Sequence, residues 1–153
     1  MSIKYNRVEL HVAFQDGNLN SSEFKDLKNF SDEEIRLLTT FISNVTNEKS
    51  LVGKNKPSWL NDNGEKIADT DAYEDGNYWH YHCGPYNESA RIQAVTFNLN
   101  FNPLGLTSNA VIHYQKENDG KILIVGFSPT HLPFPKSDDP HENPLFENID
   151  SDD

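Results

Sequence analysis

Histidines in two short stretches of the chain have the types and spacing that acid–base or metal chemistry uses. His80 and His82 stand two residues apart in YWHYHCG, and His131 follows Pro129 in FSPTHLPFP. The imidazole side chain titrates near neutral pH, so it can both accept and release protons. Two imidazoles at this spacing can also bind one metal ion. The surrounding sequence must therefore distinguish between packing, metal binding and catalysis.

An extended backbone would place the two histidines of YWHYHCG on the same face of a sheet. His80 and His82 would point to one side, and the aromatic and thiol side chains between them to the other. We expect the aromatic side to be the core side, so the histidines would line the outer face of the sheet or a cleft over it. His113, in a later strand, and His131, just past the last strand, can converge with them.

The residues alone leave several interpretations open. The histidines can be ordinary half-buried residues that make hydrogen bonds, or general acid–base groups. A metal site needs a third ligand, and no Asp or Glu has a suitable spacing in the adjoining strands, so we predict no metal and no other cofactor. Cys83 is either a nucleophile beside His82 or a buried apolar residue. Sequence signatures of nucleotide-binding loops and serine hydrolases are absent.

Length and composition indicate one folded domain. The 153 residues include 11% aromatic side chains, and we predict a globular domain over 1–147 with a disordered acidic tail over 148–153. The chain begins without the apolar segment of a signal peptide and contains no run long enough for a membrane helix. Its only cysteine fits a reducing compartment. We therefore expect a cytoplasmic protein without a membrane partner.

The net charge of −11 is concentrated in two segments. Residues 61–76 carry 6 acidic side chains and one lysine, and residues 137–153 carry 7 acidic side chains and no lysine or arginine. Residues 1–60 are neutral in sum, and residues 77–136 have a net charge of +1. As a whole, this charge repels a phosphate backbone, which counts against binding of nucleic acid.

Periodicity predicts an α+β fold, in which one main helix packs on a mostly antiparallel sheet. Ser31 and Glu34 have the spacing of a capping box, so a helix should run from there to about residue 47. Residues 49–76 have the composition of a long acidic loop. We expect a short helical turn over 24–27, a hairpin turn over 117–120, and strands over 5–14, 78–83, 90–101, 109–116 and 121–128.

Three stretches in this order resemble the YafO-type toxins, a branch of the RelE-like ribonuclease toxins. They are FSDEEIRLLTTFIS, NYWHYHCG and AVIHYQKENDGKILIVGFSPTHLPF, within about residues 30–147. The resemblance implies a small α+β fold, endonucleolytic cleavage of messenger RNA on the ribosome, and a cognate antitoxin that blocks the site. The positions that match are His80, His82, Tyr114 for the strand aromatic, and His131.

RNA cleavage of this kind needs a base for the ribose 2′-hydroxyl, an acid for the leaving 5′-oxygen and a cation for the phosphate. On the resemblance, His82 and His131 would share the first two roles without a metal. Arg91, Lys116 or Lys136 would supply the cation.

The charge of the chain departs from the family pattern, because RelE-like toxins are usually basic. The acidic sequence PKSDDPHENPLFENIDSDD stands where such toxins commonly have a basic helix. A rival interpretation follows: an acidic immunity or inhibitor protein that covers the active site of a basic nuclease toxin, with fast electrostatic association. The sequence leaves both interpretations open.

Overall fold

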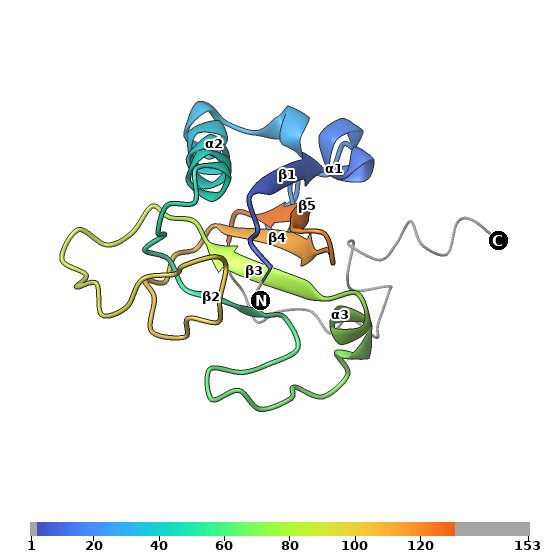
Figure 1. Cartoon of the computed structure of the whole chain (residues 1–153). Coiled ribbons are helices and arrows are strands. Elements are labelled where there is room, and N and C mark those ends of the chain that lie inside the picture. Colours follow the sequence, from blue (N-terminus) through green and yellow to red (C-terminus); the bar gives the residue numbers. More distant parts are fainter. Residues whose placement is uncertain (1–2, 131–153) are drawn as a thin grey trace.

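The computed structural model describes residues 3–130, and in it one long helix lies across a five-stranded sheet (Figure 1). The strands follow the order β1-β5-β4-β3-β2, and only the edge strand β1 is parallel to its neighbour. The predicted α+β class is confirmed. In chain order the elements are β1 (Arg7–Leu10), α1 (Val12–Asp16), η1 (Leu27–Asn29), α2 (Asp32–Thr46), β2 (Asn55–Pro57), α3 (Asp71–Asp75), β3 (Tyr78–His82), β4 (Val111–Lys116) and β5 (Lys121–Ser128).

Helix α2 begins at the residue that the sequence predicts. The Ser31 side chain accepts a hydrogen bond from the Glu34 backbone, and the Glu34 carboxylate accepts one from the Ser31 backbone. This capping box satisfies two backbone N–H groups that the first turn of a helix otherwise leaves unpaired. Leu38, Phe41 and Val45 follow at helical spacing and are all buried. The helix therefore presents one apolar stripe to the sheet.

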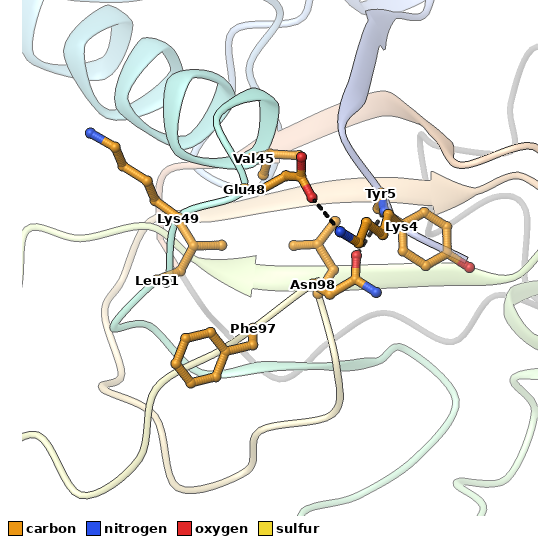
Figure 2. Close-up of a pocket in the computed structure, with 9 residues that line it drawn as sticks. Lys4, Tyr5, Val45, Glu48, Lys49, Leu51, Phe97 and Asn98 are labelled. Atoms are coloured by element: carbon orange, nitrogen blue, oxygen red, sulfur yellow. Dashed lines mark hydrogen bonds and ion pairs between the residues drawn. The ribbon is translucent and has the colours of Figure 1, made fainter. Parts of the chain in front are cut away.

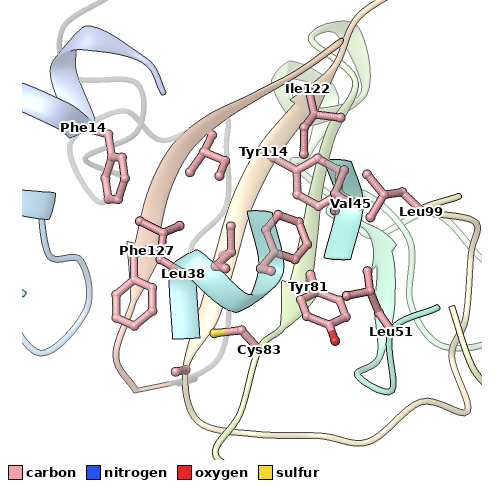
Figure 3. Close-up of a cluster of buried hydrophobic side chains, with 14 residues drawn as sticks. Phe14, Leu38, Val45, Leu51, Tyr81, Cys83, Leu99, Tyr114, Ile122 and Phe127 are labelled. Carbon is pink, nitrogen blue, oxygen red and sulfur yellow. The ribbon is translucent and has the colours of Figure 1, made fainter. Parts of the chain in front are cut away.

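The core lies between this stripe and one face of the sheet (Figure 3). Tyr81, Tyr114 and Phe127 come from the three central strands and pack on this side together with Cys83. The ring of Phe41 stacks on that of Tyr81, with centroids 5.1 Å apart. The prediction that the aromatic and thiol side of YWHYHC faces the core is confirmed. The histidines of that strand therefore belong to the other face.

The prediction of a strand over 90–101 is wrong. The alternating apolar residues belong to an irregular loop that is bridged to 51–55, and Asn98 and Leu99 adopt left-handed backbone conformations with φ of 50° and 54°. A side chain anchors this loop: Asn55 Nδ2 donates to the Leu99 and Asn100 carbonyl oxygens. Buried amide side chains here satisfy the backbone groups that a strand ladder would otherwise pair.

A direct consequence is that β4 is the immediate neighbour of β3. The sequence-based prediction placed one strand between them, whereas the register pairs His80 with His113. Directly opposed residues of an antiparallel pair share a face, with Cβ atoms about 4.5–5.5 Å apart. The two histidines therefore lie side by side.

The remaining elements differ from the predictions in detail. The N-terminal strand ends at Leu10, and Phe14 reaches the core from α1 instead of from a strand. The short helical turn lies at η1, a few residues later than predicted. Residues 49–76 form the predicted long excursion, but it contributes β2 and α3. The predicted turn between β4 and β5 is present, with Gly120 at a φ of 87°.

The predicted disordered tail, 148–153, lies outside the described residues. Within residues 3–130, no helix has the length and apolar character needed to cross a membrane.

Candidate functional site

Three imidazole rings form a row on the face of the sheet opposite α2. His80 and His82 alternate with core residues along β3, and His113 lies across from His80 on β4. The ring centroids of His80 and His82 are 5.9 Å apart, and those of His80 and His113 are 6.3 Å apart. All three side chains are buried, with 3%, 4% and 1% of their surface exposed, respectively. We call these residues the histidine row.

Each imidazole of the histidine row has a polar partner from a different segment. His80 Nδ1 lies 2.9 Å from Ser58 Oγ, and His113 Nε2 lies 2.7 Å from Ser128 Oγ. His82 Nδ1 lies 2.9 Å from the carbonyl oxygen of Ser108 and 3.1 Å from its backbone nitrogen. These contacts orient the rings. They also offset part of the free-energy cost of removing these polar rings from water.

Two lysines flank the histidine row, Lys56 on the edge strand β2 and Lys54 directly before it. Lys56 pairs with His80 across β2 and β3, and the carbonyl of Lys54 accepts the backbone N–H of His82. The Asp62 carboxylate holds both ammonium groups, at 2.6 Å from Lys54 Nζ and 2.8 Å from Lys56 Nζ. Burial by itself would raise the pKa of Asp62, but the hydrogen bonds from the two lysines lower it below its ordinary value. Two positive charges and one negative charge therefore border the row.

Alternation along β4 places Tyr114 and Lys116 on the face away from the histidine row. Tyr114 is buried beneath α2, and its hydroxyl donates to Asn55 Oδ1 at 2.6 Å. Burial raises the pKa of Tyr114 well above its ordinary value. Lys116 Nζ donates to the Leu99 carbonyl oxygen at 2.6 Å and lies 3.4 Å from the centre of the Trp79 ring. The structure does not bring these two predicted site residues to His82, because successive side chains of a strand point to opposite faces.

The other predicted residues do not join the histidine row in the described part of the chain. Arg91 is exposed in the irregular loop that follows β3. His131 and Lys136 lie outside the described residues. Within residues 3–130, the structure thus brings His80 and His82 together with His113, whose convergence with them the sequence also predicted.

The thiol of Cys83 is poorly suited to nucleophilic attack. It lies in the core, and burial raises its pKa to about 12. The thiolate is the reactive form, so such a thiol is inert at neutral pH. Among residues 3–130, no group of three or more His, Cys, Asp or Glu side chains is arranged to bind a metal ion.

Sequence reasoning missed the groups that surround the histidines. Ser58, Ser108 and Ser128 come from three separate loops or strand ends, and nothing in their local sequence marks them. Lys54 and Lys56 did carry a signal, because KNKPS has two lysines at strand spacing immediately before a proline. That signal was hidden in a segment whose composition is typical of a loop.

In comparisons with known proteins, no family model, curated protein or solved structure matches the chain.

Proposed function

We propose that this chain is an RNA-cleaving toxin of the RelE-like class, which cuts messenger RNA on the ribosome by metal-independent acid–base catalysis. The observation that carries the proposal is the histidine row: three imidazoles on adjacent strands, bordered by two lysines. Proton donors and acceptors close to cations are the groups that phosphodiester cleavage requires.

The chemistry assigns one proton transfer to each of two histidines. His80 or His82 removes the proton from the ribose 2′-hydroxyl, whose oxygen then attacks the adjacent phosphorus. The other imidazole protonates the departing 5′-oxygen, so that the P–O5′ bond breaks and a 2′,3′-cyclic phosphate forms. Ser58 and Ser108 orient these two rings through Nδ1. The resemblance to RelE-like toxins also keeps His131 as a candidate for one of these transfers.

The cations that contact the phosphate are residues that the sequence-based prediction did not include: Lys54 and Lys56, in place of Arg91 and Lys116. In the structure Asp62 forms ion pairs with both ammonium groups, so the phosphate of the substrate has to displace the Asp62 carboxylate. Because the rings of the histidine row are at most 4% exposed, this face has to open when RNA bound to the ribosome arrives.

An expression experiment tests this proposal. Induced wild-type chain should arrest growth in the absence of its antitoxin, and mapped messenger RNA ends should carry cyclic phosphates. Replacement of a proton-transfer group lowers a rate by about 10²–10⁴-fold, so His82→Ala should relieve the arrest. His82→Asn, which retains a polar group near Ser108, separates loss of chemistry from loss of folding. The matched control is His11→Ala, because His11 caps α1 away from the row.

A specific observation also favours a second candidate, an inhibitor of a basic nuclease. Every acidic residue of the segment 61–76 is exposed: Asp62, Glu65, Asp69, Asp71, Glu74 and Asp75. Lys66 is the one basic residue of that segment, and Asp71 and Glu74 already hold it at 2.7 Å and 2.5 Å. Such a surface would steer a basic partner and speed its association.

The two candidates predict opposite results from the same strain. If wild-type expression is harmless and the purified chain instead binds a basic nuclease with strongly salt-dependent association, the inhibitor is favoured. If His82→Asn remains folded by circular dichroism but still arrests growth as the wild type does, acid–base catalysis by that imidazole is refuted.

A further inference from the structure

A cavity of about 210 Å³ opens on the core side of the sheet, away from the histidine row (Figure 2). Its apolar wall comes from the end of α2 and the two segments beside it: Val45, Leu51, Phe97 and Leu99. Phe97 has 59% of its surface exposed. A cavity of about 150 Å³ is known to hold benzene. This one can therefore hold a ring or a short branched chain.

The N-terminal segment forms the opposite wall, and one side chain holds it there. Asn98 Oδ1 accepts the backbone N–H of Tyr5, and Asn98 Nδ2 donates to the carbonyl of Ile3, both at 2.7 Å. The amide thus pairs with the segment as a neighbouring strand would. The backbone of Asn98 is itself left-handed, with φ of 50°. The wall is therefore built by specific hydrogen bonds.

The mouth of the cavity carries more positive than negative side chains, although the protein as a whole is acidic. Lys4, Lys49 and Glu48 line it, and the only ion pair described among them joins Lys4 Nζ to Glu48 Oε1 at 3.4 Å. Both partners are largely exposed, at 74% and 49%, so an incoming carboxylate can compete for Lys4 at little cost. In Figure 2 the Lys4–Glu48 pair lies over the cavity, whereas the Lys49 side chain extends away from it.

A further amine lies behind the cavity wall. Lys116 Nζ is 4.9 Å from the centre of the Tyr5 ring and donates to the Leu99 carbonyl oxygen, and both of these residues line the cavity. Burial lowers the pKa of Lys116 to about 7. Tyr5 is the other titratable group in contact with this amine, and burial raises its pKa above the ordinary value, so it stays neutral near pH 7. An anion placed in the cavity would favour protonation of Lys116.

We propose that this cavity is a binding site for a small molecule with an apolar body and a carboxylate. The apolar body lies against Val45, Leu51 and Leu99, and the carboxylate meets Lys4 at the mouth. Lys4 at the mouth and Lys116 behind the wall are two amines near the site, against one carboxylate, Glu48, in a protein whose formal charge is −11. The cavity is smaller than the roughly 300 Å³ at which drug-sized ligand pockets begin, so the ligand is a short-chain or single-ring acid. This proposal is independent of the proposed function.

The probe for the test is 4-phenylbutyrate, and its neutral counterpart is 4-phenylbutanol. Methyl-selective NMR on the full-length protein should show shifts at Val45, Leu51 and Leu99 on addition of the acid, and a weaker affinity for the alcohol. Because Glu48 and Lys4 have opposite charges, Glu48→Gln should tighten binding of the acid and Lys4→Gln should weaken it. Each change should be about two- to fivefold, as expected for an exposed ion pair. Lys28→Gln, an exposed lysine in η1, is the matched control for charge.

Two further measurements test the cavity and the amine behind it. Phe97→Ala removes an exposed wall and should weaken binding, whereas Phe101→Ala, in the same loop but not part of the wall, should not. Calorimetry at pH 7 in buffers of different ionisation enthalpy should show proton uptake on binding, which Lys116→Met abolishes. Equal affinity for the acid and the alcohol, shifts confined to residues outside the cavity, or binding of the acid without proton uptake would each overturn the proposal.

Discussion

Replacement of Asn55 by alanine should destabilise the protein far more than the removal of an asparagine side chain typically does. Asn55 is fully buried on β2, and its side chain connects three parts of the fold. Its Nδ2 donates to the Leu99 and Asn100 carbonyl oxygens, and its Oδ1 accepts the Tyr114 hydroxyl. The substitution removes all three hydrogen bonds at once.

The magnitude follows from what remains unpaired. Leu99 keeps a partner, because Lys116 Nζ also donates to its carbonyl oxygen. The Asn100 carbonyl is partly buried and can recruit water, but the Tyr114 hydroxyl is enclosed in the core. An unsatisfied buried polar group costs about 1–3 kcal/mol, so we expect Asn55→Ala to lower the free energy of unfolding by about 2–4 kcal/mol. For a chain of this size the melting temperature should fall by roughly 5–15 °C.

Urea denaturation of a double-mutant cycle is the assay. Tyr114→Phe alone leaves Asn55 Oδ1 without its donor and should lower the free energy of unfolding by about 1–2 kcal/mol. In the double variant neither group is orphaned, so the combined loss should be smaller than the sum by about 1–2 kcal/mol. Additive losses would refute the reasoning, because they would mean that the Tyr114–Asn55 hydrogen bond does not couple the two sites.

The remaining predictions concern a helix cap, a buried amine and a buried thiol. Ser31→Ala should lower the free energy of unfolding by about 0.5–2 kcal/mol in urea denaturation, whereas Ser31→Asp should retain most of it because the carboxylate can still accept from the Glu34 backbone. Burial lowers the pKa of Lys116 to about 7 in the folded chain, whereas in the unfolded chain this amine keeps its ordinary pKa of 10.5. The free energy of unfolding of the wild type, measured relative to that of Lys116→Met, should therefore rise with pH between these two values. Equal pH dependence of the two proteins would contradict this prediction. Because burial raises the pKa of Cys83 to about 12, the native protein should resist iodoacetamide at pH 8 and react only in denaturant, and rapid native labelling would show that the thiol is accessible.

Local sequence was sufficient for the elements whose signals lie within a few residues of each other. The capping box of Ser31 and Glu34 and the apolar spacing after it predicted α2 almost to the residue. Aromatic content predicted β3, and a run that is apolar on both faces predicted β5. Alternation of side chains assigned the core face of β3 correctly. These features depend on backbone geometry and periodicity, which a single segment contains completely.

The histidine row was predictable only in part. HxH spacing showed that His80 and His82 share a face, but it did not show what lies beside them. The prediction that Tyr114 and Lys116 join the site ignored that their position along β4 sends both to the core side. The side chain of His113 points to the opposite face from that of Tyr114, and His113 is the residue of β4 that lies across from His80.

The sequence by itself determined the α+β class, the main helix and the paired histidines, since each depends on short-range order. Tertiary structure alone decided that 90–101 is a loop, because Asn55 reaches it from 44 residues away and replaces a strand ladder with side-chain hydrogen bonds. That decision made β3 and β4 neighbours and so placed His80 opposite His113. Which polar groups a segment finds as partners depends on residues remote in the chain, and no pattern within the segment contains that information.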